Sequence, residues 1–364
     1  MPAVTDLNFR PAAAGAGRGR GTTAHLQRLL SKALAPSTSY SYRAALDAFE
    51  AWLCAEGLPP VGALRLIPDE LDHYAAEYIA ACWAKDRSKG KTKARNVPYA
   101  LRAAHPGIAR LPTAERAAKA WHRDFPSVRY PPMSQEVMAA VAVRMALNGH
   151  WLSAAQAVIS FHCMNRVNEC AQLLREHVFL GDMAGGRVAA FGTKYGFRIP
   201  RAKGVDEAFC EVHDPNAKAL LQIACEGVPN GAHVFPNASA FRRHLSEACA
   251  QLGLSDKYVP HSLRHGGATH RHLMGQAMQD IQLAGRWAVA RSTERYIQPG
   301  RNLLLDAKAD DTVLRTGHDA APRIAAWIIA AAEFHQNEVD AAAASRLVRT
   351  TPHAVKARQQ QRQR

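Results

Sequence analysis

The sequence predicts a mainly α-helical chain with a small antiparallel sheet, an α+β protein with two main domains. Apolar residues recur at helical spacing over most of the chain, and only the stretch from Val178 to Val212 is typical of strands. Prolines at Pro126, Pro131 and Pro132 separate two helical regions. The 364 residues also exceed the roughly 250 at which one core usually stops growing. We therefore place a domain boundary after residue 128.

The first region is predicted to be an arm followed by a helical domain. Residues 1–24 are rich in Ala, Gly and Arg and cannot bury a core, so they form either a flexible basic arm or an inert linker. Tyr42, Phe49 and Leu53 share one face of a predicted helix. The other helices of this domain, residues 25–128, are expected after Pro68, over 96–104 and over 113–123.

A dense run of positive charge lies between these helices. Six of the eleven residues in this run are basic: Lys85, Arg87, Lys89, Lys91, Lys93 and Arg95. Such density in a loop is unfavourable unless an anion neutralises it, so we expect contact with the phosphates of DNA. The alternative is a solvated loop without a ligand.

The second domain, residues 129–305, is predicted to combine helices with one hairpin. Ser134 is suited to cap a helix that carries Val137 and Val141, and another helix leads to Arg166. The hairpin is expected where two strand-like runs flank a turn, namely Arg187–Phe191 and Phe197–Pro200 around Gly192–Gly196. Helices resume at Asp214 and again over 241–252.

Residues 306–364 are predicted to form a helical extension with a basic tail. Ile324, Trp327, Ile328 and Ala331 share one helical face, which can pack on its own domain or on a neighbouring protomer. The Gln/Arg-rich end of the chain is suited to nonspecific contact with DNA.

Composition favours a nucleic-acid partner inside the cell. The 46 Lys and Arg residues against 31 Asp and Glu give a net charge of +15, which favours a polyanion. The seven cysteines form no Cys-x-x-Cys pair, which indicates a reducing compartment. The apolar stretch Ala325–Ala332 is far shorter than the roughly 20 residues that span a bilayer. We expect a soluble protein that is not secreted and has no membrane partner.

One segment carries a recognisable pattern of chemistry. His261-Ser262-Leu263-Arg264-His265 is followed by Gly285-Arg286-Trp287 and then by Tyr296, nine residues beyond Trp287. This arrangement resembles the signature of the tyrosine recombinases, the phage integrase family. Upstream, Arg166 with Glu169 three residues later resembles the family's first-arginine motif. Thr193-Lys194-Tyr195-Gly196 resembles its lysine hairpin.

The resemblance covers roughly residues 130–300 and implies a site-specific recombinase. It implies a core-binding domain before the catalytic domain, a double-stranded DNA partner, a tetrameric assembly of identical chains on DNA, and neither cofactor nor metal. The protein would work in the nucleus of a eukaryotic host, or otherwise in the cytoplasm with the nucleoid.

The resemblance also assigns roles that suit the chemistry of a phosphodiester. Arg166 and Arg264 would clamp the phosphate, because a guanidinium fork holds two oxygens at once and stays protonated. Tyr296 would attack the phosphorus, with His261 taking its proton. The remaining roles fall on Lys194 as general acid, with Lys203 as its alternative, on Trp287 as an N–H donor to the phosphate, and on Glu169 and His265 as supporting residues.

Two departures from the family pattern concern loop geometry. Cys163-Met164-Asn165 stands where a glycine is usual, and Arg286 lies between Gly285 and Trp287. The Gly-Arg-Trp variant resembles recombinases of eukaryotic mobile elements.

Three other functions remain open at this point. The close spacing of His261, His265, His270 and His272 is compatible with a zinc hydrolase, although no Cys pair or His-Glu-x-x-His accompanies them. A noncatalytic DNA-binding protein and a type IB topoisomerase would share the fold.

Overall fold

The computed structural model describes residues 34–105, 107–108, 110–126, 130–181, 194–200, 207–254 and 258–350, with side chains described to residue 337. The chain divides into two compact units between residues 128 and 129. The predicted arm and the end of the predicted tail lie outside the described residues.

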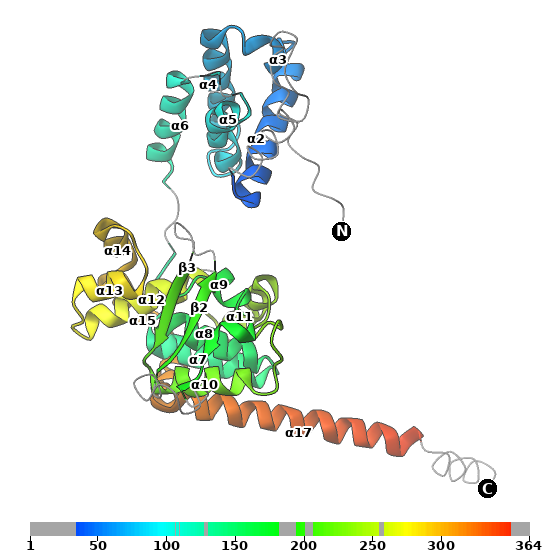
Figure 1. The fold of residues 1–364 in the computed structure, drawn as a ribbon, viewed down its shortest axis with the longest axis vertical. Coiled ribbons are helices and arrows are strands. Elements are labelled where there is room, and N and C mark those ends of the chain that lie inside the picture. Colours follow the sequence, from blue (N-terminus) through cyan, green and yellow to red (C-terminus); the bar gives the residue numbers. More distant parts are fainter. Residues whose placement is uncertain are drawn as a thin grey trace, which may run out of the picture. The chain divides into compact units, whose positions relative to one another are not determined.

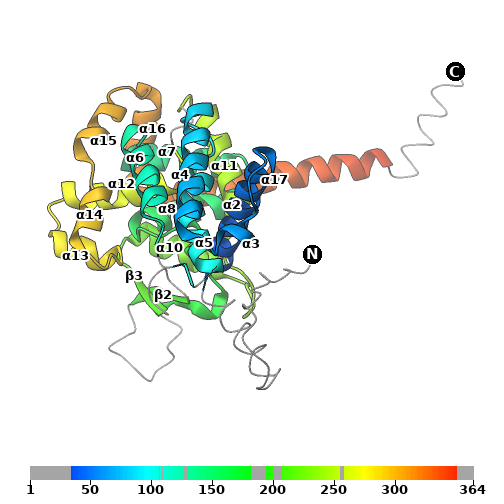
Figure 2. The ribbon, with the colours of Figure 1, turned by 90° about the horizontal axis from the view of Figure 1, so that it is seen from above.

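The first unit is a bundle of helices (Figures 1 and 2). Its elements are α2 (Pro36–Ala55), α3 (Val61–Leu64), α4 (Pro68–Lys85), α5 (Lys91–Ala104) and α6 (Pro112–Asp124). Helix α2 packs on α5, and α4 packs on α6. Phe49, Leu53, Ile79, Leu101 and Trp121 are buried between them. The structure thus has a helix over each segment where the apolar spacing predicts one.

A carboxylate from one helix caps the start of another in this unit. The backbone N–H groups of Thr113 and Ala114 each donate to a carboxylate oxygen of Asp72, both at 2.9 Å. The first N–H groups of a helix have no partner within the helix, so α4 supplies one for α6. Asp72 is buried by this contact.

The basic segment differs from its prediction. The connection between α4 and α5 spans only Asp86–Gly90, and the residues from Lys91 onward belong to α5. Lys91 is buried, and its Nζ donates to the carbonyl oxygen of Phe125. The prediction of a loop over the whole segment is therefore wrong. The Lys91 ammonium thus satisfies a carbonyl acceptor at the end of α6.

The second unit is a mostly helical body with a small sheet (Figure 1). Its helices and strands are α7 (Gln135–Leu147), α8 (Trp151–His162), α9 (Val167–Ala171), β1 (Val178–Phe179), β2 (Tyr195–Pro200), β3 (Glu207–Val212), α10 (Pro215–Cys225), α11 (Ala238–Gln251), α12 (Pro260–Leu273), α13 (Met278–Ala284), α14 (Ala290–Tyr296), α15 (Pro299–Asp306), α16 (Asp311–Ala320) and α17 (Ile324–Thr350). Helices α7 and α8 pack together at the centre. Ser134 caps α7 as predicted, since its hydroxyl accepts from the N–H of Val137 at 3.3 Å.

The sheet is antiparallel with the order β1, β2, β3. Phe197 lies opposite Val178 on one side and Cys210 on the other. The predicted strand over Phe197–Pro200 is present in β2, whereas the predicted strand over 187–191 lies outside the described residues. Tyr195 and Gly196, expected in the turn, are paired residues of β2.

The region after residue 305 shares the core of this unit. Helix α16 packs on α7, and the start of α17 packs on α7 and α8. Val313, Ile324 and Ile328 are buried there, whereas Trp327 is 42% exposed. In both ribbon views α17 then continues past the rest of the unit (Figures 1 and 2). The predicted extension therefore begins as part of its own domain. Among the described residues, no helix is both long and apolar enough to cross a membrane.

Candidate active site

Three segments of the second unit bring seven of the eight predicted catalytic and supporting residues together. The connection and first turn of α9 supply Arg166 and Glu169, and α12 supplies His261, Arg264 and His265. The turn after α13 and the end of α14 supply Trp287 and Tyr296. The contacts among these side chains, described below, define the candidate active site.

Helix α12 lies close to the backbone of its neighbours at two glycines. A Cβ added to Gly266 would overlap the carbonyl oxygen of Met133, and one added to Gly267 would overlap that of Phe161. Of the two glycines after the His-x-x-Arg-His motif, Gly266 thus allows α12 to approach the segment before α7, and Gly267 allows it to approach α8 closely. This approach sets the position of Arg264 relative to the Arg166 segment.

Arg264 lies at the centre of the site and has no exposed surface. One Nη atom donates to the carbonyl oxygen of Met164, and the other donates to that of Gly285 at 2.5 Å. Its Cζ lies 4.7 Å from the ring centroid of Trp287 and 5.3 Å from that of Tyr296. Burial, and then the neighbouring positive charge of Arg166, lower the pKa of Arg264 to about 10. At neutral pH the guanidinium is still charged.

Glu169 fixes Arg166 at the start of α9. The Nη1 of Arg166 donates to Glu169 Oε1 at 2.5 Å, and the backbone N–H of Arg166 donates to Oε2 at 2.9 Å. Burial would raise the pKa of Glu169, but Arg286 and Arg166 lower it. The carboxylate is therefore ionised at neutral pH and holds Arg166 by charge as well as by geometry.

Tyr296 lies among three other rings of the site. Its ring centroid is 5.3 Å from that of His261, 4.5 Å from that of His265 and 4.6 Å from that of Trp287. Its carbonyl oxygen accepts from Thr269 Oγ1 at 3.3 Å and lies 3.2 Å from His265 Nδ1. Together with the 5.3 Å from the Arg264 Cζ to the Tyr296 ring, these contacts place the tyrosine beside the guanidinium.

The two motif histidines are neutral near pH 7. Burial, and then the positive charges of Arg264 and Arg166, lower the pKa of His261 to about 4. Burial also lowers the pKa of His265 to about 4. A neutral imidazole can accept a proton, so His261 is in the form that a general base requires.

Several donors of the site have no acceptor. Among the described side chains, Nε of Arg264, Nε of Arg286 and the indole Nε1 of Trp287 are buried without a hydrogen-bond partner. Leaving a buried donor unpaired costs about 1–3 kcal/mol. Positively charged and N–H groups without acceptors suit an anion, and a phosphate offers several acceptor oxygens.

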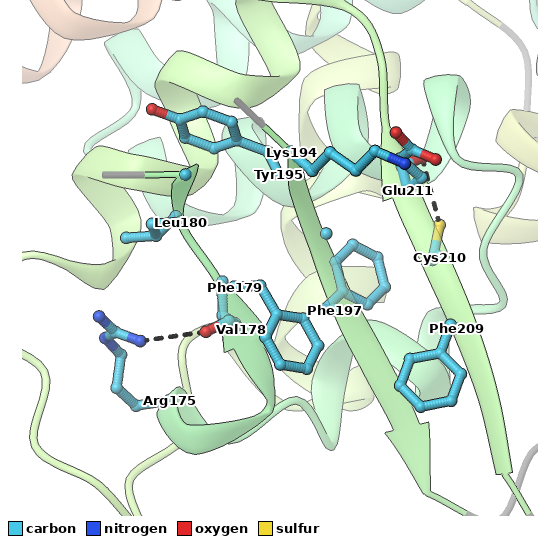
Figure 3. A pocket seen from close by; sticks show the side chains of 12 residues that line it. Arg175, Val178, Phe179, Leu180, Lys194, Tyr195, Phe197, Phe209, Cys210 and Glu211 are labelled. Atoms are coloured by element: carbon cyan, nitrogen blue, oxygen red, sulfur yellow. Dashed lines mark hydrogen bonds between the residues drawn. The ribbon is translucent and has the colours of Figure 1, made fainter. Parts of the chain in front are cut away.

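Lys194 is not among the contacts of this site in the described part of the chain. It is exposed and lies just before β2, where it lines a pocket of about 580 Å³ on the sheet. Figure 3 shows its side chain directed toward Glu211, away from the aromatic floor formed by Phe179, Phe197 and Phe209. Lys203, the alternative general acid, lies outside the described residues.

Sequence reasoning missed three residues that support the site. Thr269 and Gln298 hold the backbone after Tyr296, because the Gln298 N–H donates to Thr269 Oγ1 at 3.1 Å. In the sequence Arg286 is only a departure from the family pattern. In the structure its Nη2 donates to Glu169 Oε2 at 3.0 Å. Its unusual place between Gly285 and Trp287 was the sequence feature that could have indicated this supporting role.

The histidines that suggested a zinc hydrolase do not form a metal site among the described residues. Within the described ranges, no three His, Cys, Asp or Glu side chains are grouped so that they could hold a metal ion. His261 and His265 instead contact each other and Tyr296 through their rings.

Comparison with known proteins identifies the fold. No protein-family model matches the chain, and no curated protein matches it. A lambda integrase dimer bound to a COC′ core site is 15% identical, with a TM-score of 0.54; the match covers 76% of this chain and 94% of that one. A Tn1549 transposon integrase in complex with transposon right end DNA is 12% identical, with coverage of 73% and 99% and a TM-score of 0.46. XerA recombinase is 18% identical, with coverage of 81% and 96% and a TM-score of 0.37.

The likeness to lambda integrase shows that this chain has the fold of the tyrosine recombinases. It confirms the mainly helical architecture with a small antiparallel sheet that the sequence predicts.

Proposed function

We propose that the protein is a site-specific DNA recombinase that cuts and rejoins strands through a 3′-phosphotyrosyl intermediate. The observation that carries this proposal is the position of Tyr296 against Arg264, Trp287 and His261 within one protomer. This arrangement places a nucleophile, an anion clamp and a neutral base next to one another, as attack on a phosphodiester requires.

The clamp supplies most of the rate enhancement. Attack on a phosphodiester adds negative charge to the non-bridging oxygens, and Arg166 and Arg264 stabilise that charge with fixed guanidinium groups. The indole N–H of Trp287, which has no partner among the described residues, is the third donor. Removing one such donor typically lowers the rate by roughly 10²–10³-fold.

Two proton transfers complete the reaction. A tyrosine phenol ordinarily ionises near pH 10, so Tyr296 needs a base, and His261 is neutral at pH 7. Lys194 is the general acid for the 5′-oxygen, which requires its exposed ammonium to reach the site. The phosphotyrosyl bond keeps the energy of the broken diester, so a 5′-hydroxyl reverses the step without ATP or metal.

The partner is double-stranded DNA. The net charge of +15 and the exposed side chains of Lys85, Arg87, Lys89 and Lys93 favour contact with phosphates. Recombination exchanges strands between two duplexes, so the working form is a homo-oligomer on DNA, a tetramer when both duplexes are held. The protein therefore acts where its host keeps DNA, in the nucleus or the nucleoid.

Trapping the intermediate tests this function. The protein is incubated with nicked duplexes drawn from the DNA that flanks its gene, so that cleavage releases a short strand and cannot reverse. A DNA adduct stable to denaturation is expected with the wild type and absent with Tyr296→Phe, which should still bind DNA. Binding without any adduct would support a noncatalytic protein. Plasmid relaxation without strand exchange would support a topoisomerase.

A further inference from the structure

Arg286 adopts a backbone conformation that needs an explanation. Among the described residues other than glycine, only Met164 and Arg286 have positive φ, at 50° and 57°. L residues rarely adopt this region, and such outliers persist only where the surrounding structure holds them. The two residues are also joined, since Nη2 of Arg286 lies 3.5 Å from the carbonyl oxygen of Met164.

The side chain of Arg286 makes most of its hydrogen bonds to the segment that carries Arg166, and its Nη1 also donates to the Ala284 carbonyl at 3.2 Å. Its Nη2 donates to Asn165 Oδ1 at 2.7 Å and to Glu169 Oε2 at 3.0 Å, and its Nη1 donates to the Cys163 carbonyl at 3.5 Å. The side chain is 11% exposed. Burial would lower the pKa of Arg286, but Cys210 and Glu169 raise it. The charge is therefore permanent.

Glu169 is shared between the two arginines. Its Oε1 accepts from the Arg166 side chain, and its Oε2 accepts from the Arg286 side chain and the Arg166 backbone. Trp287 follows Arg286 directly in the chain, and α14 leads from there to Tyr296. Arg286 thus connects the arginine segment with the segment that carries the tryptophan and the tyrosine.

We propose that Arg286 is a positioning residue for strand cleavage, which sets the distance between the Arg166 clamp and the Trp287–Tyr296 segment by way of Glu169. This inference rests on the proposed function. Only an arginine meets the geometry, because its fork reaches carboxylate, amide and backbone acceptors at once, whereas a lysine presents a single point of charge.

The test measures single-turnover cleavage on the nicked duplex at a temperature well below the Tm of every variant. Arg286→Gly tolerates the positive φ and removes the side chain, and Arg286→Lys keeps the charge without the fork. We expect a loss of roughly 100-fold for Arg286→Gly, as displacement of a catalytic group by about 1 Å can produce. Arg286→Lys should recover part of that loss. Binding of uncleaved DNA should hardly change.

A double-mutant cycle separates positioning from general stability. If Arg286 acts through Glu169, cleavage by Arg286→Gly combined with Glu169→Gln is no slower than by the worse single variant. The matched control is Arg271→Lys, a half-buried arginine of α12 that donates to the His162 carbonyl at 2.7 Å and should cleave like the wild type.

Each outcome bears on a different claim. Wild-type rates for Arg286→Gly, or losses that multiply in the double variant, would overturn the positioning role while the recombinase function stands. Absence of an adduct with the wild type would overturn the proposed function and, with it, this role in cleavage.

Discussion

His265 is buried and His261 is half-buried beside positively charged groups, and both pKa values are lowered to about 4. In the unfolded chain a histidine has a pKa of about 6.5. Between these values the unfolded state binds more protons than the folded state, so the free energy of unfolding decreases as the pH falls from about 6.5 toward 4.

We therefore predict that the Tm decreases as the pH falls through this window. The double variant His261→Asn, His265→Asn removes two of the responsible groups and should show a shallower decrease. Thermal unfolding followed by circular dichroism at pH 7.5, 6, 5 and 4.5 measures both slopes. Equal slopes in the two proteins would show that these histidines are not held neutral by the fold.

At the scale of single residues, the sequence predicts which residues form the candidate active site but not the hydrogen bonds and ion pairs between them. The spacing from Trp287 to Tyr296 is enough to select the tyrosine, and the structure brings that ring to the Arg264 guanidinium. No local pattern predicts that Arg286 and Arg166 share one carboxylate, because residues more than 100 positions apart meet only in the folded chain. Lys194 remains a prediction, since its place in the reaction depends on a segment that the structure describes only from residue 194 onward.

At the scale of elements, the close approach of α12 to α8 decides where the motif residues lie. Gly267→Ala would place a methyl group on the Phe161 carbonyl, a backbone atom that cannot rotate away. We predict a loss of stability of about 1–3 kcal/mol, as for overpacked cores. Gly300→Ala on α15, where a Cβ meets nothing within 4 Å, is the control and should be neutral or slightly stabilising.

Urea unfolding of the two variants provides the measurement. The glycine prediction is contradicted if Gly267→Ala unfolds at the same urea concentration as Gly300→Ala.

The elements themselves were largely predictable, and their ends were not. Helical spacing identifies α2, α4, α6, α7 and α11, because each has an apolar face. The start of α5 escaped prediction because positive charge suggests solvent, whereas the Lys91 ammonium is held by a carbonyl at the end of α6. A contact between residues 34 positions apart thus overrides the local composition.

At the scale of the whole molecule, positive charge should govern binding to DNA. Each contact with a phosphate releases a counterion and contributes about 0.9 to the slope of log affinity against log salt concentration. Replacing the exposed Lys85, Lys89 and Lys93 with Gln should reduce this slope by about 0.9 for each lysine that contacts a phosphate. Fluorescence anisotropy with a labelled duplex at several salt concentrations gives the slopes.

Lys91 supplies the comparison for that measurement. Because it is buried, Lys91→Gln should lower the Tm while leaving the salt slope unchanged. A slope that responds to Lys91 and not to the three exposed lysines would show that the first unit presents a different surface to DNA.

The most direct measurement identifies the atom that becomes joined to DNA. The wild-type protein is trapped on a nicked duplex, digested with protease and nuclease, and the nucleotide-bearing peptide is sequenced by mass spectrometry. We predict a 3′-phosphonucleotide on the phenolic oxygen of Tyr296 and on no other residue. A nucleotide on any other side chain, or linkage through a 5′-phosphate, would contradict the account.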